Sequence, residues 1–279
     1  RSIGQAIFVL VIFVSLITYL SLFRIDYFEN VRNVTLLFAL PVFFCVIASL
    51  MVSHKILNVF MLTCCLVPIV IRVFMDSRTA FMFHCGMVLI ISLMLTSNYE
   101  FIVVQLVAGM VAIQTLRELS QRSQIVRTAF IIFLVYVICY TGYSLHHEND
   151  IKMDTWMYVC FTVNCVLLLF AYPFLCVLEK MFGFTSDVTL VELSNVHNPL
   201  LQRMTEVAPG TFQHSMQVAN LSAEVANKIG GKAQLVRTGA LYHDIGKMER
   251  PVFFTENQNG LSPHKHLTPL KSAEVIINR

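Results

Sequence analysis

The stretch QAIFVLVIFVSLITYLSLF, residues 5–23, carries no charged side chain. A helix needs about 20 mostly apolar residues to cross a lipid bilayer, so this stretch is long enough to span one. Six more apolar runs follow, at residues 34–52, 56–71, 79–96, 101–116, 125–145 and 155–178. The third run is short and contains Pro68, so we expect it to be tilted, kinked or partly interfacial. The pattern predicts a seven-helix transmembrane bundle.

Charge divides the chain into a membrane part and a soluble part. Residues 1–180 hold 20 charged side chains and the remaining 99 residues hold 17. Overall 13% of residues are charged, against roughly 25% in soluble domains. We therefore predict a seven-span module over residues 1–180, a juxtamembrane linker helix over 181–198 and a soluble domain over 199–279. The small net charge of +3 argues against a nucleic-acid polymer as a partner.

The cationic residues predict the orientation of these spans. Short links make neighbouring helices antiparallel, and cytoplasmic loops are enriched in Lys and Arg. If all seven runs span and the soluble domain is cytoplasmic, seven arginines lie inside and three cations lie outside. The inside set is Arg24, Arg32, Arg72, Arg78, Arg117, Arg122 and Arg127, and the outside set is Arg1, Lys55 and Lys152. The excess favours a cytoplasmic soluble domain.

Polar residues within the runs are few. Ionisable groups lie near the ends of the runs, whereas an ion pathway usually needs them inside the membrane, so transport is disfavoured. Gln105 and Asn164 lie in mid-run, and we expect each to hydrogen-bond a neighbouring helix rather than a substrate.

The soluble part shows helical spacing of apolar residues and no strand-like alternation. We expect an amphipathic helix from Asp187, a short helix over 199–206, and helices over 212–229 and 232–245. Thr211 is the expected N-cap of the third helix, and Gly246 is the expected stop of the fourth. A last helix opens at Pro269. The predicted fold class is therefore all-α throughout.

The string YHDIGK at residues 242–247 combines groups that bind metal and phosphate. His243 and Asp244 offer an imidazole and a carboxylate side by side, and both are ligands for divalent metals. The two oxygens of Asp244 can bridge two metals, which together can clamp a phosphate and activate a water. Lys247 follows one helical turn later, so its ammonium can contact the same phosphate.

A further ligand comes from the preceding helix. His214 lies one turn into the helix over 212–229, which a two-glycine turn at 230–231 joins to the next. Antiparallel helices place the start of one beside the end of the other, so His214 is expected to meet His243 and Asp244. The alternative is a structural helix end, in which His243 caps carbonyls, Asp244 forms a local turn and Gly246 is the left-handed stop.

Several strings extend this pattern: HNPLL at 197–201, APGTFQHS at 208–215, VANL at 218–221, GALYHDIGK at 239–247, RPVFF at 250–254 and ENQ at 256–258. Together they resemble the bacterial seven-transmembrane receptors with an HD domain, the cyclic-di-AMP phosphodiesterase family. The resemblance covers residues 187–279, and the seven apolar runs match the layout of the family's membrane module. Family members also carry an extracellular domain before the spans, so we expect the sequence to be a fragment.

The resemblance implies an all-helical HD domain with two divalent metal ions, iron or manganese. It makes His214, His243 and Asp244 metal ligands, and gives Asp244 and Lys247 catalytic roles, with Lys247 contacting the substrate phosphate. Arg250 and the residues at 256–258 are candidates for the nucleotide pocket, and a structural loop role fits them equally well. The family supplies further ligands after the helix at 272–279, so the HD domain is expected to be incomplete here.

The leading hypothesis is an enzyme of the bacterial inner membrane that hydrolyses cyclic-di-AMP to the linear dinucleotide under control of the membrane module. Its expected partners are the cyclic dinucleotide and the lipid bilayer, and a homodimer stays open. One alternative is a receptor whose HD domain binds a nucleotide without cleaving it. Another is an HD hydrolase of cyclic-di-GMP or a guanosine alarmone.

Overall fold

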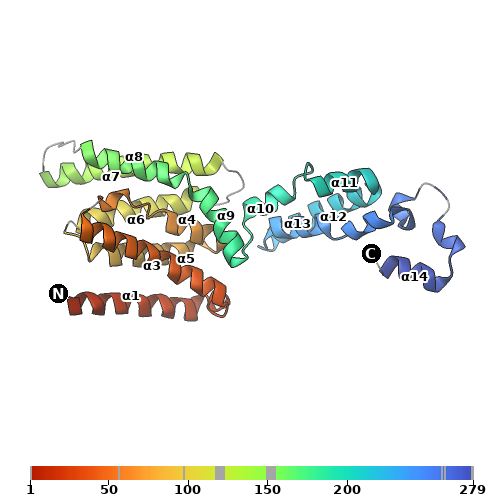
Figure 1. Cartoon of the computed structure of the whole chain (residues 1–279), viewed down its shortest axis with the longest axis horizontal. Coiled ribbons are helices and arrows are strands. Elements are labelled where there is room, and N and C mark those ends of the chain that lie inside the picture. Colours follow the sequence, from red (N-terminus) through yellow and green to blue (C-terminus); the bar gives the residue numbers. More distant parts are fainter. Residues whose placement is uncertain are drawn as a thin grey trace. The chain divides into compact units, whose positions relative to one another are not determined.

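Helices alone make up the regular structure of the computed structural model, which describes residues 2–55, 57–96, 98–116, 123–148, 155–258, 260 and 262–277. No strand occurs in these ranges, which confirms the all-α prediction. The chain divides into two compact units, residues 1–186 and residues 187–279 (Figure 1).

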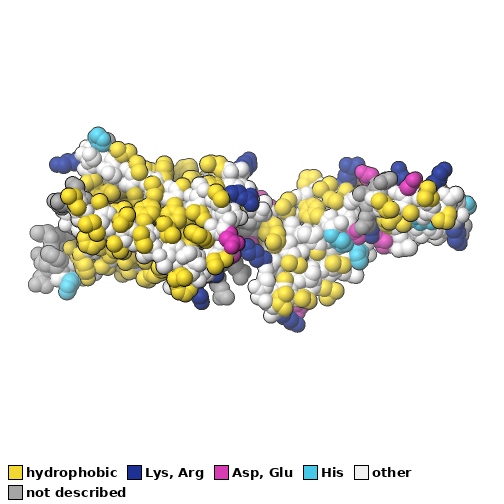
Figure 2. All heavy atoms as spheres, turned by 90° about the horizontal axis from the view of Figure 1, so that it is seen from below, with side chains coloured by type: hydrophobic (Ala, Val, Ile, Leu, Met, Phe, Trp, Pro, Cys, Tyr) yellow, Lys and Arg dark blue, Asp and Glu magenta, His cyan; other side chains and the backbone are white. Residues whose placement is uncertain are grey.

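The first unit packs its helices side by side. Helix α5 contacts α1, α3, α4 and α6, and the order continues from α6 to α7 and α8 (Figure 1). Hydrophobic side chains cover most of its visible face in Figure 2. The helices are α1 Ser2–Phe23, α2 Ile25–Phe28, α3 Val31–His54, α4 Leu66–Phe74, α5 Ser77–Ser92, α6 Asn98–Thr115, α7 Ser123–Glu148, α8 Thr155–Leu168 and α9 Ala171–Phe182.

Three helices, α1, α3 and α7, are each long and apolar enough to cross a membrane within the described residues. Helices α8 and α9 form a fourth candidate if they count as one span, although they meet at a bend of 45°. The predicted span over 155–178 is therefore bent between its two helices, and it stays a prediction that the pair crosses the membrane once. The run at 56–71 is also broken, as the 3₁₀ helix η1 (Val59–Met61) and α4 are separate. The described helices do not by themselves establish seven spans.

The break between η1 and α4 leaves backbone carbonyls without helical partners. Asn164, fully buried on α8, donates from its amide nitrogen to the carbonyls of Phe60 and Leu62, both at 3.1 Å. Such bonds are needed because a backbone group without a partner is costly in an apolar core. Gln105 is likewise bonded to a neighbouring helix, since its side-chain oxygen accepts from the Tyr136 hydroxyl at 2.9 Å. Both expectations for these polar residues are confirmed.

Replacement of this amide tests its structural role. We expect Asn164→Leu to destabilise the membrane unit by about 2 kcal/mol, because the buried Phe60 carbonyl loses its side-chain donor and the Leu62 carbonyl keeps only the N–H of Cys64. Thr162→Val on the same helix is the control, since the exposed Thr162 hydroxyl bonds only the Tyr158 carbonyl of its own helix. It should change stability by less than about 0.5 kcal/mol. Unfolding in detergent micelles measures both, and equal effects would contradict the assignment.

Four of the cations used to predict orientation, Arg1, Arg117, Arg122 and Lys152, lie outside the described residues. Two of the others make contacts that bring helix ends together. Arg24, after α1, forms an ion pair with Asp76 at the start of α5. Arg32, in the first turn of α3, lies 3.5 Å from the carbonyl oxygen of Phe182 at the end of α9. The end of α1, the starts of α3 and α5, and the end of α9 therefore share one end of this unit.

The second unit is built on the hairpin of α12 and α13, against which α10 and α11 pack. Gly230 makes the turn possible with a φ of +74°, a conformation that glycine adopts without strain. Leu201, Ala219 and Leu241 form its buried core. The elements are α10 Asp187–Leu193, α11 Pro199–Val207, α12 Pro209–Lys228, α13 Ala233–Tyr242, the 3₁₀ helices η2 Ile245–Glu249, η3 Pro251–Phe253, η4 Thr255–Asn257 and η5 Pro263–His266, and α14 Pro269–Ile277.

Two predicted helix ends are wrong in this unit. Helix α12 begins at Pro209, so Thr211 lies inside its first turn rather than at the N-cap. A proline suits the first helical position, where its missing N–H has no partner to lose. Helix α13 ends at Tyr242, and Gly246 belongs to η2 instead of stopping the helix. His243 and Asp244 therefore lie at the junction between an α-helix and a 3₁₀ helix.

Candidate metal centre

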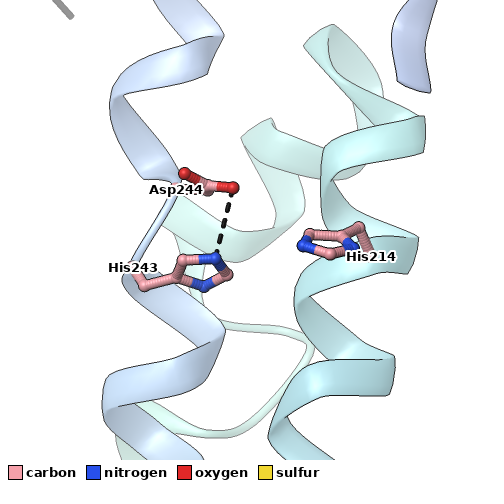
Figure 3. Close-up of side chains that lie close together, drawn as sticks. All are labelled: His214, His243 and Asp244. Atoms are coloured by element: carbon pink, nitrogen blue, oxygen red, sulfur yellow. Dashed lines mark ion pairs between the residues drawn. The ribbon is translucent and has the colours of Figure 1, made fainter. Parts of the chain in front are cut away.

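Three side chains from the two helices of the hairpin converge. His214 extends from α12 toward His243 and Asp244 at the end of α13 (Figure 3). One possible ligand atom from each of the three lies within 4.8 Å of the others. The ring centres of the two histidines are 5.8 Å apart. The second turn of α12 and the end of α13 thus lie side by side, and the role of these groups as metal ligands stays a prediction.

The hydrogen bond of His243 sets which ring nitrogen can bind a metal. Its Nδ1 lies 2.7 Å from the carbonyl oxygen of Ala240. A carbonyl only accepts, so Nδ1 carries the proton, and Nε2 is the ring nitrogen that can offer a lone pair to a metal. This Nε2 lies 3.2 Å from Oδ2 of Asp244 (Figure 3). An imidazole nitrogen and a carboxylate oxygen are both ligands for divalent metals, so this pair, with His214 beside it, fits such an ion.

Lys247 lies between two carboxylates. Its Nζ is 2.8 Å from Oδ2 of the buried Asp244 and 2.6 Å from Oε1 of Glu256. It also lies 5.1 Å from the ring centre of Phe254, a cation–π distance. Burial lowers the pKa of Lys247, but the hydrogen bonds with both carboxylates outweigh it and raise the pKa above its ordinary value. The ammonium therefore stays charged at neutral pH.

The opposite balance holds for Glu256. Burial raises the pKa of this carboxyl, but the hydrogen bonds it accepts and the charge of Lys247 together outweigh burial, so the pKa lies below its ordinary value. Glu256 is thus ionised at neutral pH, and together with Asp244 it surrounds one ammonium with two negative charges. Sequence reasoning placed Glu256 in a possible nucleotide pocket and did not foresee this ion pair.

The segment of residues 254–257, here called the clamp segment, also holds the start of α12. The side-chain oxygen of Asn257 accepts from the backbone N–H of Thr211 at 3.1 Å, and its amide donates to the Thr211 hydroxyl at 2.7 Å. That hydroxyl donates in turn to Oε1 of Glu256 at 3.1 Å. Asn257 therefore satisfies a free N–H of the helix start from a distant part of the chain. The one feature of the sequence that fits this contact is Gly210, because the clamp segment passes too close to α12 there for a larger residue.

Arg250 has a different environment from Lys247. Its side chain is exposed just before η3. The structure shows no contact of Arg250 with His214, His243 or Asp244 among the described residues. Lys247, expected to contact a substrate phosphate, is thus held against the candidate site, whereas Arg250 was a candidate only for the nucleotide pocket. A role in substrate binding stays a prediction for both.

Comparison with known proteins places both units. Residues 1–186 match the family described as 7TM receptor with intracellular HD hydrolase, and residues 211–276 match the HD domain. Over 81% of the chain, the sequence is 32% identical to the cyclic-di-AMP phosphodiesterase PgpH of Listeria monocytogenes. It is 34% identical to the protein of that name from Bacillus subtilis over 66% of its length. An uncharacterized protein of Synechocystis is 53% identical over 32% of the chain and 11% of its own length.

These relatives are much longer than the chain. The chain spans 32% of the Listeria protein and 26% of the Bacillus protein. No solved structure matches it.

Proposed function

Since the chain belongs to the family of seven-transmembrane receptors with an intracellular HD hydrolase, we propose that the protein is a membrane-anchored, metal-dependent phosphodiesterase that hydrolyses cyclic-di-AMP to the linear dinucleotide. The observation that carries this proposal is the convergence of His214, His243 and Asp244 within 4.8 Å. The name of the two PgpH relatives supports the substrate.

The residues of the site divide into two roles. His214, His243 and Asp244 would hold two divalent ions, iron or manganese, to which Asp244 can offer two oxygens and each histidine one nitrogen. Such ions supply charge neutralisation and an activated water when bound. Ala240 keeps the proton of His243 on Nδ1, which leaves Nε2 as the ligand atom. Lys247 offers its ammonium to a phosphate oxygen of the substrate, and its raised pKa keeps it charged for that contact.

We further propose that the first unit crosses the bacterial inner membrane seven times with the HD domain in the cytoplasm, and that it regulates hydrolysis. The end of α1, the starts of α3 and α5, and the end of α9 share one end of the unit, as the contacts of Arg24 and Arg32 indicate. Alternation of seven spans requires this arrangement. The same end carries Arg24 and Arg32, two of the arginines that favour the cytoplasmic side.

Hydrolysis of cyclic-di-AMP by the full protein in detergent or nanodiscs tests the proposed activity. With Mn²⁺ present we expect conversion to the linear dinucleotide, and we expect a chelator to stop it until Mn²⁺ is restored, because the metal supplies the activated water. Product identity by chromatography is the measurement. Cyclic-di-GMP and guanosine alarmones are run beside it at equal concentration.

Each other result selects a different function. Saturable binding of cyclic-di-AMP with no product, in a metal-loaded protein, would indicate a receptor that senses the nucleotide without cleaving it. Faster cleavage of cyclic-di-GMP or of an alarmone would reassign the substrate while keeping the HD hydrolase. Turnover that survives complete removal of metal would reject the metal-dependent mechanism.

A further inference from the structure

The ammonium of Lys247 and a bound metal ion would both interact with Oδ2 of Asp244. Lys247 Nζ lies 2.8 Å from Oδ2 of Asp244, and the Nε2 atom of His243 faces this same oxygen at 3.2 Å. A cation bound between His243 and Asp244 therefore competes with Lys247 for one carboxylate oxygen. If Asp244 is to bind a metal, another group must bind the Lys247 ammonium and keep it in the site.

Glu256 meets that need. Its Oε1 lies 2.6 Å from Lys247 Nζ, closer than Asp244, and accepts a second hydrogen bond from the Thr211 hydroxyl. We propose that Glu256 is a positioning residue that shares the Lys247 ammonium with Asp244, so that Asp244 stays available to a divalent metal. The proposal rests on the assignment of Asp244 as a metal ligand in the proposed function.

The contacts of Glu256 fix its carboxylate from two sides. Thr211 lies in the first turn of α12, the helix that carries His214, and Lys247 lies in η2, directly after Asp244. One carboxylate oxygen thus joins the two elements that contribute the candidate ligands. Asn257 holds Thr211 in place with two further hydrogen bonds. Because its partners are fixed, Glu256 can hold the ammonium in one place with little loss of side-chain freedom on binding.

A cycle of variants in the full protein tests the proposal with Mn²⁺ alone and no nucleotide. In Glu256→Gln the ammonium loses its charged partner and turns wholly to Asp244, so we expect Mn²⁺ binding to weaken about tenfold. In Lys247→Met no ammonium competes, so adding Glu256→Gln should change Mn²⁺ affinity by less than about twofold. Glu224→Gln is the matched control on α12, because Glu224 is exposed and far along the helix from the site. Calorimetric titration measures all four.

The pattern across the cycle decides the matter. An unchanged affinity in Glu256→Gln, or the same loss with and without Lys247, would overturn the proposal. If Glu256→Gln fails to fold, Glu256→Asp replaces it. This variant keeps the charge but is too short to reach both partners, and its smaller loss of affinity should again vanish in Lys247→Met.

The hydrolysis assay separates this proposal from the proposed function. Suppose that Glu256→Gln weakens Mn²⁺ binding only when Lys247 is present, in a protein that does not cleave cyclic-di-AMP. This result would reject the substrate and keep the role of Glu256. If Glu256→Gln has the same effect with and without Lys247, in a protein that does cleave cyclic-di-AMP, the role of Glu256 is rejected and the activity is kept. A wild-type protein that binds no Mn²⁺ would overturn both.

Discussion

Asp244→Asn is expected to remove metal from the protein and to lower cyclic-di-AMP hydrolysis by more than about a hundredfold. The amide has nearly the shape of the carboxylate, but it is neutral and offers one oxygen, so it is a poor ligand for a divalent ion. Lys247 keeps its ion pair with Glu256 in this variant, which limits the disturbance of the fold. Metal content by elemental analysis and turnover by chromatography are the two measurements.

The control for this variant is Asp187→Asn. Asp187 is an exposed residue in the first turn of α10, in the same unit as Asp244. Its replacement should leave metal content and turnover unchanged. A variant at Asp244 that retained its full metal content would remove Asp244 from the ligand set, whatever its turnover.

Gly210→Ala is expected to destabilise the second unit by about 3 kcal/mol. A Cβ at this position would overlap the backbone carbonyl of Glu256 and would lie 2.9 Å from Oδ1 of Asn257. Backbone atoms cannot move aside as a flexible side chain does, so the clamp segment must separate from α12. The N–H of Thr211 then loses its acceptor and should exchange with solvent faster.

Gly239→Ala provides the opposite expectation within the same hairpin. Nothing lies within 4 Å of a Cβ at Gly239, which is an exposed position of α13. Alanine is favoured over glycine in a helix by about 1 kcal/mol, so this variant should be as stable as the wild type or more so. Hydrogen exchange followed by mass spectrometry compares the two variants in the full chain. Equal protection of the α12 start in both would contradict the close crossing at position 210.

The features that sequence reasoning predicted are those that depend on local patterns. Apolar spacing and the Gly230 turn define the α12–α13 hairpin, and the hairpin alone brings His214 to His243 and Asp244. The roles of these residues rest on the family, because a cluster of such side chains has no unique chemistry. Helix geometry thus predicted the location of the candidate site, but its function required the comparison with relatives.

The features that sequence reasoning missed depend on contacts between distant residues. Thr211 suits an N-cap locally, but Asn257, 46 positions away, satisfies the helix start instead. The break after η1 is stabilised by an amide more than a hundred residues further on, at Asn164. No local sequence pattern around residue 60 indicates that Asn164 is the partner. Glu256 was a candidate for the nucleotide pocket, but its pairing with Lys247 follows only from the fold.

The amide of Asn164 has just two protons, and its two hydrogen bonds to Phe60 and Leu62 use both of them. These two hydrogen bonds therefore link α8 to the segment at residues 59–62. We expect a displacement of α8 to carry that segment with it, although a long stretch of chain separates the two. The two segments would then move as one body rather than as independent elements.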